Sequence, residues 1–154
     1  NVISHAIEER VIADRLHCEV YAGFQRLALL KPQTRRYRAL LDTARFVSVF
    51  GLNDLSSHSP TADLQHPRLL RFVIDPQVGS GLEWFWFVVV EDARFRTALL
   101  AQHVAGNLWA HQQNARSYAG VWTFNDALVR EIVAILRQAG RALYYRHAPD
   151  DATP

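Results

Sequence analysis

Near the start of the chain, the residues best able to bind a metal ion or transfer a proton are His5, Glu8 and Glu9. His5 and Glu9 are one helical turn apart, so a helix would place both side chains on one face, where a metal ion could contact them. A metal site needs a third ligand at a defined position, and the spacing of the sequence supplies none. We therefore interpret His5 and Glu9 as an exposed, charge-assisted pair and predict no metal site.

Nucleophilic catalysis needs a base beside the nucleophile. Cys18 opens an expected strand with His17 next to it, and alternation along a strand directs these two side chains to opposite faces. The glycines of Gly79-Ser80-Gly81 precede a strand rather than a helix, so no phosphate-binding turn is indicated. We expect a protein that is not an enzyme.

Glu83 is the ionisable residue at the start of an unusually apolar run that ends at Asp92. A strand there is predicted to be buried on both faces, as is typical of the centre of a sheet covered by helices. The Glu83 carboxylate at the start of this strand would need Arg26, Arg36 or a bound molecule to offset the cost of its desolvation. The alternation predicts two sets of side chains: Trp84, Trp86, Val88 and Val90 on one face, Phe85, Phe87 and Val89 on the other.

Two glycines interrupt predicted strands, Gly23 and Gly120. A strand glycine permits another group to approach the backbone closely, either a packed helix or a ligand, and both alternatives stay open. Beside Gly120, the aromatic residues Tyr118, Trp122 and Phe124 could wall a cavity for a planar or apolar molecule.

These residues must be positioned by elements that alternate between strand and helix patterns. Apolar spacing predicts an amphipathic first helix to about Leu16 and a second one beginning near Pro32, with a long loop over 53–67. Strands are expected over 18–25, 46–52, 69–74, 83–92 and 118–124.

Two further helices are predicted in the second half of the chain. Asp92 is the expected N-cap of one that carries Phe95, Ala98, Leu99 and Gln102 on one face, followed by an irregular stretch over 106–115. The other begins at Asn125 or Asp126 and is closed by Gly140. Its inward residues are expected to be Leu128, Ile132, Ile135, Leu136 and Ala139.

Composition indicates one globular domain. The chain has 154 residues, of which 49% are hydrophobic and 21% charged, enough to bury a core. We expect one domain over 1–147 and a linker or tail over 148–154. A formal charge of +2 does not indicate direct nucleic-acid binding, and no apolar run is long enough for a membrane span. With one cysteine and no methionine, the chain is expected to be a cytoplasmic segment of a longer protein.

Several blocks resemble the DICT domain, a sensory module named for its occurrence in diguanylate cyclases and two-component systems. The block that contains Gly120 and Trp122 is the most specific of them. In order, the blocks are Ser4-His5-Ala6-Ile7-Glu8-Glu9, Gly23-Phe24-Gln25-Arg26, Arg36-Tyr37-Arg38-Ala39-Leu40, Val47-Ser48-Val49-Phe50-Gly51, Glu83-Trp84-Phe85 with Val88-Val89-Val90, and Tyr118-Ala119-Gly120-Val121-Trp122-Thr123-Phe124-Asn125.

The resemblance implies a non-catalytic bacterial signalling domain fused to output modules such as cyclic-dinucleotide enzymes, histidine kinases or DNA-binding regulators. It identifies no ligand and no cofactor. The sequence departs from the family pattern at Ala119 and Asn125, where acidic residues are expected, and at Gln102-His103, which replaces an Arg-Glu pair.

We therefore predict an α/β domain with a mixed sheet of about five strands and helices packed against it. The expected partners are an output domain, a small-molecule ligand and a second copy of the chain. The alternatives are an interaction or dimerisation module without a ligand, and a small hydrolase or transferase that uses Glu83 as its base. The predicted ligand-binding residues are Gln25, Arg26, Tyr37, Glu83, Trp84, Gly120 and Trp122.

Overall fold

The computed structural model describes residues 2–53, 64–75, 77, 81–104 and 117–147. Four of the sequence predictions lie wholly or partly outside the described residues. They concern the loop over 53–67, the Gly79-Ser80-Gly81 segment, the irregular stretch over 106–115 and the tail over 148–154.

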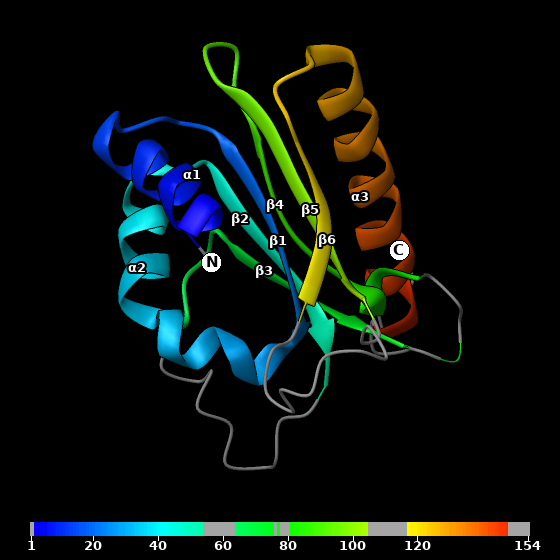
Figure 1. Ribbon diagram of the computed structural model, residues 1–154. Coiled ribbons are helices and arrows are strands. Elements are labelled where there is room, and N and C mark those ends of the chain that lie inside the picture. Colours follow the sequence, from blue (N-terminus) through cyan, green and yellow to red (C-terminus); the bar gives the residue numbers. More distant parts are fainter. Residues whose placement is uncertain (1, 54–63, 76, 78–80, 105–116, 148–154) are drawn as a thin grey trace.

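A six-stranded mixed sheet forms the middle layer of the molecule (Figure 1). The strand order is β3-β2-β1-β4-β5-β6; β1, β2 and β3 pair in parallel, and β4, β5 and β6 extend the sheet in antiparallel fashion from β1. Edge strands are therefore β3 and β6. The strands are β1 (Glu19–Arg26), β2 (Phe46–Leu52), β3 (Leu69–Ile74), β4 (Phe85–Glu91), β5 (Arg96–Val104) and β6 (Ser117–Thr123).

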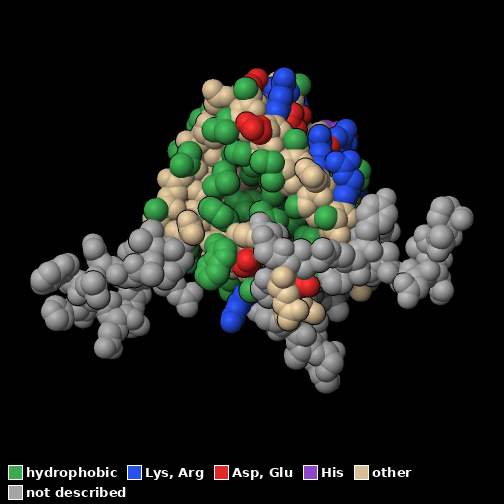
Figure 2. All heavy atoms as spheres, turned by 90° about the vertical axis from the view of Figure 1, so that its right-hand side faces the viewer, with side chains coloured by type: hydrophobic (Ala, Val, Ile, Leu, Met, Phe, Trp, Pro, Cys, Tyr) green, Lys and Arg blue, Asp and Glu red, His purple; other side chains and the backbone are tan. Residues whose placement is uncertain are grey.

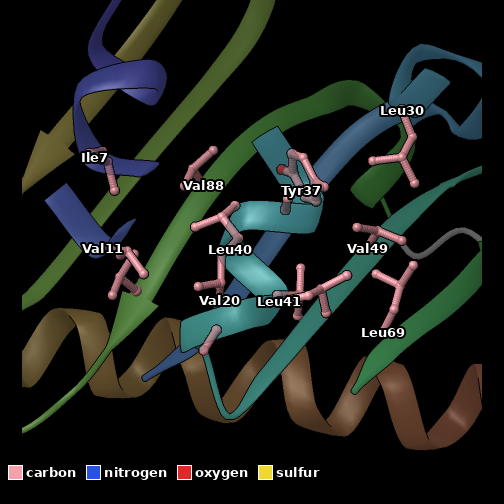
Figure 3. Packing of buried hydrophobic residues seen from close by; sticks show 14 of the residues in the cluster. Ile7, Val11, Val20, Leu30, Tyr37, Leu40, Leu41, Val49, Leu69 and Val88 are labelled. Carbon is pink, nitrogen blue, oxygen red and sulfur yellow. The ribbon is translucent and has the colours of Figure 1, made fainter. Parts of the chain in front are cut away.

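Helices α1 (Val2–Ala13) and α2 (Thr34–Thr43) cover one face of the sheet, and the 3₁₀ segment η1 (Leu27–Gln33) joins β1 to α2 (Figure 1). Apolar side chains at helical spacing drive this packing. Figure 3 shows Ile7 and Val11 of α1 and Leu40 of α2 meeting the β-branched side chains of the sheet, among them Val20 and Val88.

Helix α3 (Asp126–His147) covers the opposite face. The predicted inward face of this helix is partly wrong, because Leu128 and Ile135 are exposed. Gly140 also lies within the helix and does not end it; a Cβ there would come within 3.1 Å of the Phe72 ring, so close packing on β3 accounts for the glycine. The buried apolar side chains in the described part of α3 are Val129, Val133, Leu136 and Leu143.

The helix predicted from Asp92 is wrong, since Arg96–Val104 is the strand β5. The apolar residues Ala98 and Leu99 fit one face of a helix, but they also fit the two faces of a strand that is buried on both sides. Pairing with β4 selects the strand over the helix. This segment is the sixth strand, which the predicted sheet of about five lacked.

The alternation predicted for the central strand is confirmed along β4 but is wrong for Trp84, which precedes the strand and is exposed. Trp86, Val88 and Val90 face the core under α1 and α2, whereas Phe87 and Val89 face the core under α3. The predicted α/β class and mixed sheet are likewise confirmed.

Candidate functional site

A cavity of about 500 Å³ lies between the sheet and the helices α1 and α2. Its walls come from seven helices and strands that extend from α1 to β6. Helix α1 contributes Ser4, His5 and Glu8, α2 contributes Arg36 and Tyr37, and β4 contributes Trp86 to Val88. The remaining wall comes from β1, η1, Ala101 of β5 and Tyr118 of β6.

Glu8 is the buried carboxylate of this cavity, with only 4% of its surface exposed. The Tyr37 hydroxyl donates to Glu8 Oε1 at 3.0 Å, and Arg36 Nη1 donates to Oε2 at 3.2 Å. Arg36 Nη1 also donates to Gln33 Oε1 at 3.0 Å. The buried charge is thus paired and hydrogen-bonded, as a charge in a protein interior requires.

The position of Glu8 follows from the pattern of α1. Ser4, Ile7, Glu8 and Val11 are the buried residues of this helix, at the spacing of one helical stripe. The inner face of α1 therefore carries a carboxylate between two apolar residues, and that carboxylate accepts a hydrogen bond from Arg36 of α2.

Burial shapes the ionisation of this cluster. Desolvation raises the pKa of Glu8, and the hydrogen bond from Tyr37 and the charge of Arg36 oppose that rise. Burial and the neighbouring Glu8 hold the pKa of Tyr37 well above its usual range. Loss of hydration and the nearby Arg36 lower the pKa of His5.

Gln25 reaches the cavity from an unusual backbone position. Its φ is 57°, in the left-handed region, and the register of β1 against β2 shifts between Gly23 and Arg26. Such a conformation in a residue with a side chain stores strain and is common at binding sites. Here it ends β1 beside the cavity, and the Gln25 amide donates to the Trp84 carbonyl at 3.4 Å.

Aromatic side chains supply the apolar part of the cavity wall. Phe24, Tyr37, Trp86 and Tyr118 all line it, and the rings of Phe24 and Tyr37 are tilted against each other at a centroid distance of 5.4 Å. The polar and aromatic residues together can bind a molecule with a flat body and hydrogen-bonding edges.

The structure brings two of the predicted ligand-binding residues, Gln25 and Tyr37, to the cavity. Three others, Arg26, Glu83 and Trp84, lie beside it at the end of β1 and in the 3₁₀ segment η4 (Leu82–Trp84), and do not line it. Trp84 is 63% exposed. Glu83 is half-buried, and Arg36, one of its predicted partners, instead pairs with Glu8.

Gly120 and Trp122 lie on the edge strand β6 and also do not line the cavity. Trp122 Nε1 donates to Thr97 Oγ1 at 2.9 Å, and its half-exposed ring packs against Phe124. A Cβ at Gly120 would lie 2.6 Å from the Leu100 carbonyl oxygen, so this glycine permits close approach of β6 to β5.

Gly23, by contrast, lines the cavity and lies against the ring of Phe87. A Cβ at this position would lie 2.3 Å from the Phe87 ring, so that ring fills the space that the missing side chain leaves. Neither glycine makes room for a packed helix: the close neighbour is a ring of β4 at Gly23 and the backbone of β5 at Gly120.

Sequence reasoning missed Ser4, His5, Glu8, Arg36 and Trp86 as parts of one site. The available signal was Glu8, because a carboxylate in the apolar stripe of α1 requires a buried partner. His5 was paired with Glu9 by spacing, but Glu9 is exposed on the outer face of the helix.

A second polar cluster joins α3 to the start of β1. Glu19 is buried, and its carboxylate accepts hydrogen bonds from Arg45 and, at 2.7 Å, from Arg137. Tyr21 donates to Glu19 at 2.5 Å and accepts from Arg137 at 3.0 Å. A pocket of about 230 Å³ lies beside Glu19 and Glu91. The ion pairs of Glu19 with Arg45 and Arg137 tie β1 to neighbouring elements.

Other chemistry has less support in the described part of the chain. No group of three histidine, cysteine or acidic side chains lies close enough there to hold a metal ion. Cys18 is buried, and burial, reinforced by Asp92, raises the pKa of its thiol to about 12. Among the helices described, none is both long and apolar enough to cross a membrane.

Comparison with known proteins gives one match. No curated protein and no solved structure is similar enough to the chain to match it. The DICT family, described as a sensory domain in diguanylate cyclases and two-component systems, matches residues 1–104. That range includes α1, α2 and five of the strands and ends before the Tyr118–Asn125 block. Because the match extends over more than half of the sequence, the chain belongs to the DICT family of sensory domains.

Proposed function

We propose that this DICT domain senses a small molecule that binds in the cavity between the sheet and the helices α1 and α2. The observation that carries the proposal is a cavity of about 500 Å³ whose wall includes the buried Glu8 and its partly exposed partner Arg36. A domain used only for packing gains little from a buried carboxylate and its ion pair, because hydrophobic residues of the same volume are often as stable.

The cavity fits a flat molecule that carries hydrogen-bond acceptors. Trp86 and Phe24 offer aromatic faces, and Arg36, Gln25 and Gln33 offer N–H groups. Arg36 and Tyr37 already satisfy Glu8, so the ligand would meet a compensated pair rather than a bare carboxylate.

The relay is proposed to run through α1. This helix contributes Glu8 to the cavity and is tied to α2 through Arg36 and Tyr37. A ligand that prefers one placement of α1 against α2 would shift the population toward that state. An attached output domain would read the shift, in a cytoplasmic homodimer that makes no direct contact with nucleic acid.

Mass spectrometry tests the proposal. The natively purified domain is measured before and after denaturation, and we expect a released small molecule from the wild-type chain. Ala101 is buried in the cavity wall, so Ala101→Leu should reduce the released amount at least tenfold. Ala134→Leu, on the exposed surface of α3, is the matched control and should leave it unchanged.

Catalysis is not part of the proposed function. We expect no hydrolase, kinase or cyclase activity in the isolated domain. Turnover of a nucleotide or phosphoester that survives purification and disappears in Glu83→Gln would contradict this and revive the alternative in which Glu83 acts as a base.

The second candidate is an interaction module without a ligand. Exposed apolar side chains on β6 and α3, such as Val121 and Ile135, favour it. Release of no molecule from wild type, together with equal melting temperatures for wild type and Ala101→Leu, would support this candidate over sensing.

A further inference from the structure

A second apolar stripe runs along α3 beside the stripe that faces the sheet. Ile135 is 56% exposed and Leu128 is 42% exposed, and contiguous exposed apolar side chains of this kind mark interaction surfaces. The stripe follows the alternating spacing of four and three residues that is typical of helix pairing. Its members are Leu128, Ile132, Ile135, Ala139 and Ala142.

The stripe continues onto the edge of the sheet. Val121 of β6 is 60% exposed and pairs with Leu100 of β5, so both side chains lie on the α3 side of the sheet. Leu100 and Ile132 both pack at the margin of the core under α3, which links the strand and the helix. Figure 2 shows hydrophobic side chains gathered in the middle of this side of the molecule.

We propose that a second copy of this chain covers this surface, with the two α3 helices antiparallel about a two-fold axis near Ile135. The proposal rests on the homodimer of the proposed function, to which it adds a surface and a symmetry. A two-fold contact requires the patch to be complementary to itself.

Shape complementarity supports the antiparallel arrangement. Large side chains, Leu128 and Ile132, occupy the first half of the stripe, and small ones, Ala139 and Ala142, occupy the second half. An antiparallel pair centred on Ile135 places each large residue opposite a small one. A parallel pair would place each residue opposite its own copy, leaving small residues facing each other at one end.

The polar residues that border the stripe are complementary in the same arrangement. Glu131 and Gln138 are exposed, four residues before and three residues after Ile135, so in the antiparallel pair each carboxylate would lie near an amide donor of the other copy. Arg137 points instead toward Glu19 of its own chain, which keeps its charge out of the contact.

Cysteine cross-linking tests the symmetry in the full chain with Cys18 replaced by alanine. Ile135→Cys should form a covalent dimer under mild oxidation, because the two copies meet at the axis. Leu128→Cys alone should cross-link at least tenfold less, and Leu128→Cys combined with Ala142→Cys should again give the dimer. Efficient cross-linking of Leu128→Cys alone would overturn the antiparallel arrangement, and no cross-linking in any variant would overturn the surface.

Light scattering tests the surface independently. Ile135→Lys should convert the dimer to a monomer, whereas Ala134→Lys, exposed one residue away and off the stripe, should leave the dimer intact. Circular dichroism checks that both variants fold. A dimer that survives Ile135→Lys overturns this surface alone, and a wild-type monomer at high concentration overturns the homodimer. Neither result bears on the ligand released from the cavity.

Discussion

Glu8 and Glu19 are both buried carboxylates, and their partners differ in exposure. Glu8 is paired with Arg36 and with the fully buried hydroxyl of Tyr37, in the wall of a cavity. Glu19 is paired with Arg45 and Arg137, whose side chains are about half exposed. Water can therefore replace the partners of Glu19 more readily than those of Glu8. Of these two carboxylates, Glu8 is therefore the one held by the more buried partners.

The thiol of Cys18 is expected to be inert in the folded protein. Burial and Asp92 raise its pKa to about 12, so it is almost entirely protonated at mildly alkaline pH, and the protonated form is a poor nucleophile. Ellman's reagent should therefore not react with the native chain and should titrate one thiol in urea. A fast reaction without urea would show that the β1 end of the sheet opens readily.

Glu8 is expected to make stability depend on pH in an identifiable direction. Its pKa in the folded protein is raised above the ordinary 4.5, so its contribution to the free energy of unfolding is largest below pH 4.5 and falls as the pH rises through the raised value. Glu8→Gln removes the ionisable group, so the variant does not lose this stabilisation as the pH rises. The melting temperature of the variant minus that of wild type should increase as the pH rises from below 4.5 to neutral.

The control for this measurement is Glu9→Gln, which changes an exposed neighbour on the same helix. Its melting temperature should follow that of wild type across the same range. A difference between Glu8→Gln and wild type that stays constant with pH would contradict the raised pKa of Glu8.

At the scale of elements, sequence patterns succeeded where a segment satisfied only one periodicity. The strand β4 was predicted because no amphipathic helix needs aromatic and β-branched residues so densely. The strand β5 was missed because a strand buried on both faces also satisfies helical spacing. The face of α3 was partly missed because two adjacent stripes of this helix are apolar and only tertiary packing selects Val129 and Val133.

The candidate site was harder to predict than the fold. Tyr37 and Gln25 were identified, but the Glu8–Arg36 pair joins two helices whose contact is a tertiary event. Sequence spacing reports neighbours along one element and not across two. Glu83 adjoins the apolar run of the central strand in the sequence, yet the strand begins after it, at Phe85.

Arg137 is expected to hold α3 against β1. It donates to Glu19 and to the Tyr21 hydroxyl, so Arg137→Ala should lower the free energy of unfolding by about 1 kcal/mol, a modest value because Arg137 is half exposed. Arg130→Ala, an exposed position of the same helix, should change it by less than about 0.5 kcal/mol. Urea denaturation measures both, and equal effects would show that the tie contributes nothing.

At the scale of the whole molecule, the sheet separates two surfaces with different properties. Figure 1 shows α1 and α2 on one face of the sheet and α3 on the other. The cavity lies beneath α1 and α2, and the exposed apolar stripe belongs to α3. Strands β1 and β4 contribute side chains to the cores on both faces of the sheet. The cavity wall is therefore joined through these strands to the core under α3. Because the cavity and the stripe lie on opposite faces of the sheet, substitutions in one are still expected to leave the contacts of the other in place.

This separation gives a prediction for the full-length protein that contains the domain. Ala101→Leu should fill the cavity and fix the activity of the attached output domain at one level, while light scattering still finds a dimer. Ile135→Lys should produce a monomer and remove dimer-dependent output, while mass spectrometry still finds the released molecule. If Ala101→Leu responds as wild type does, the cavity is not the input, and if Ile135→Lys also loses the released molecule, the two sides are coupled more tightly than the sheet alone predicts.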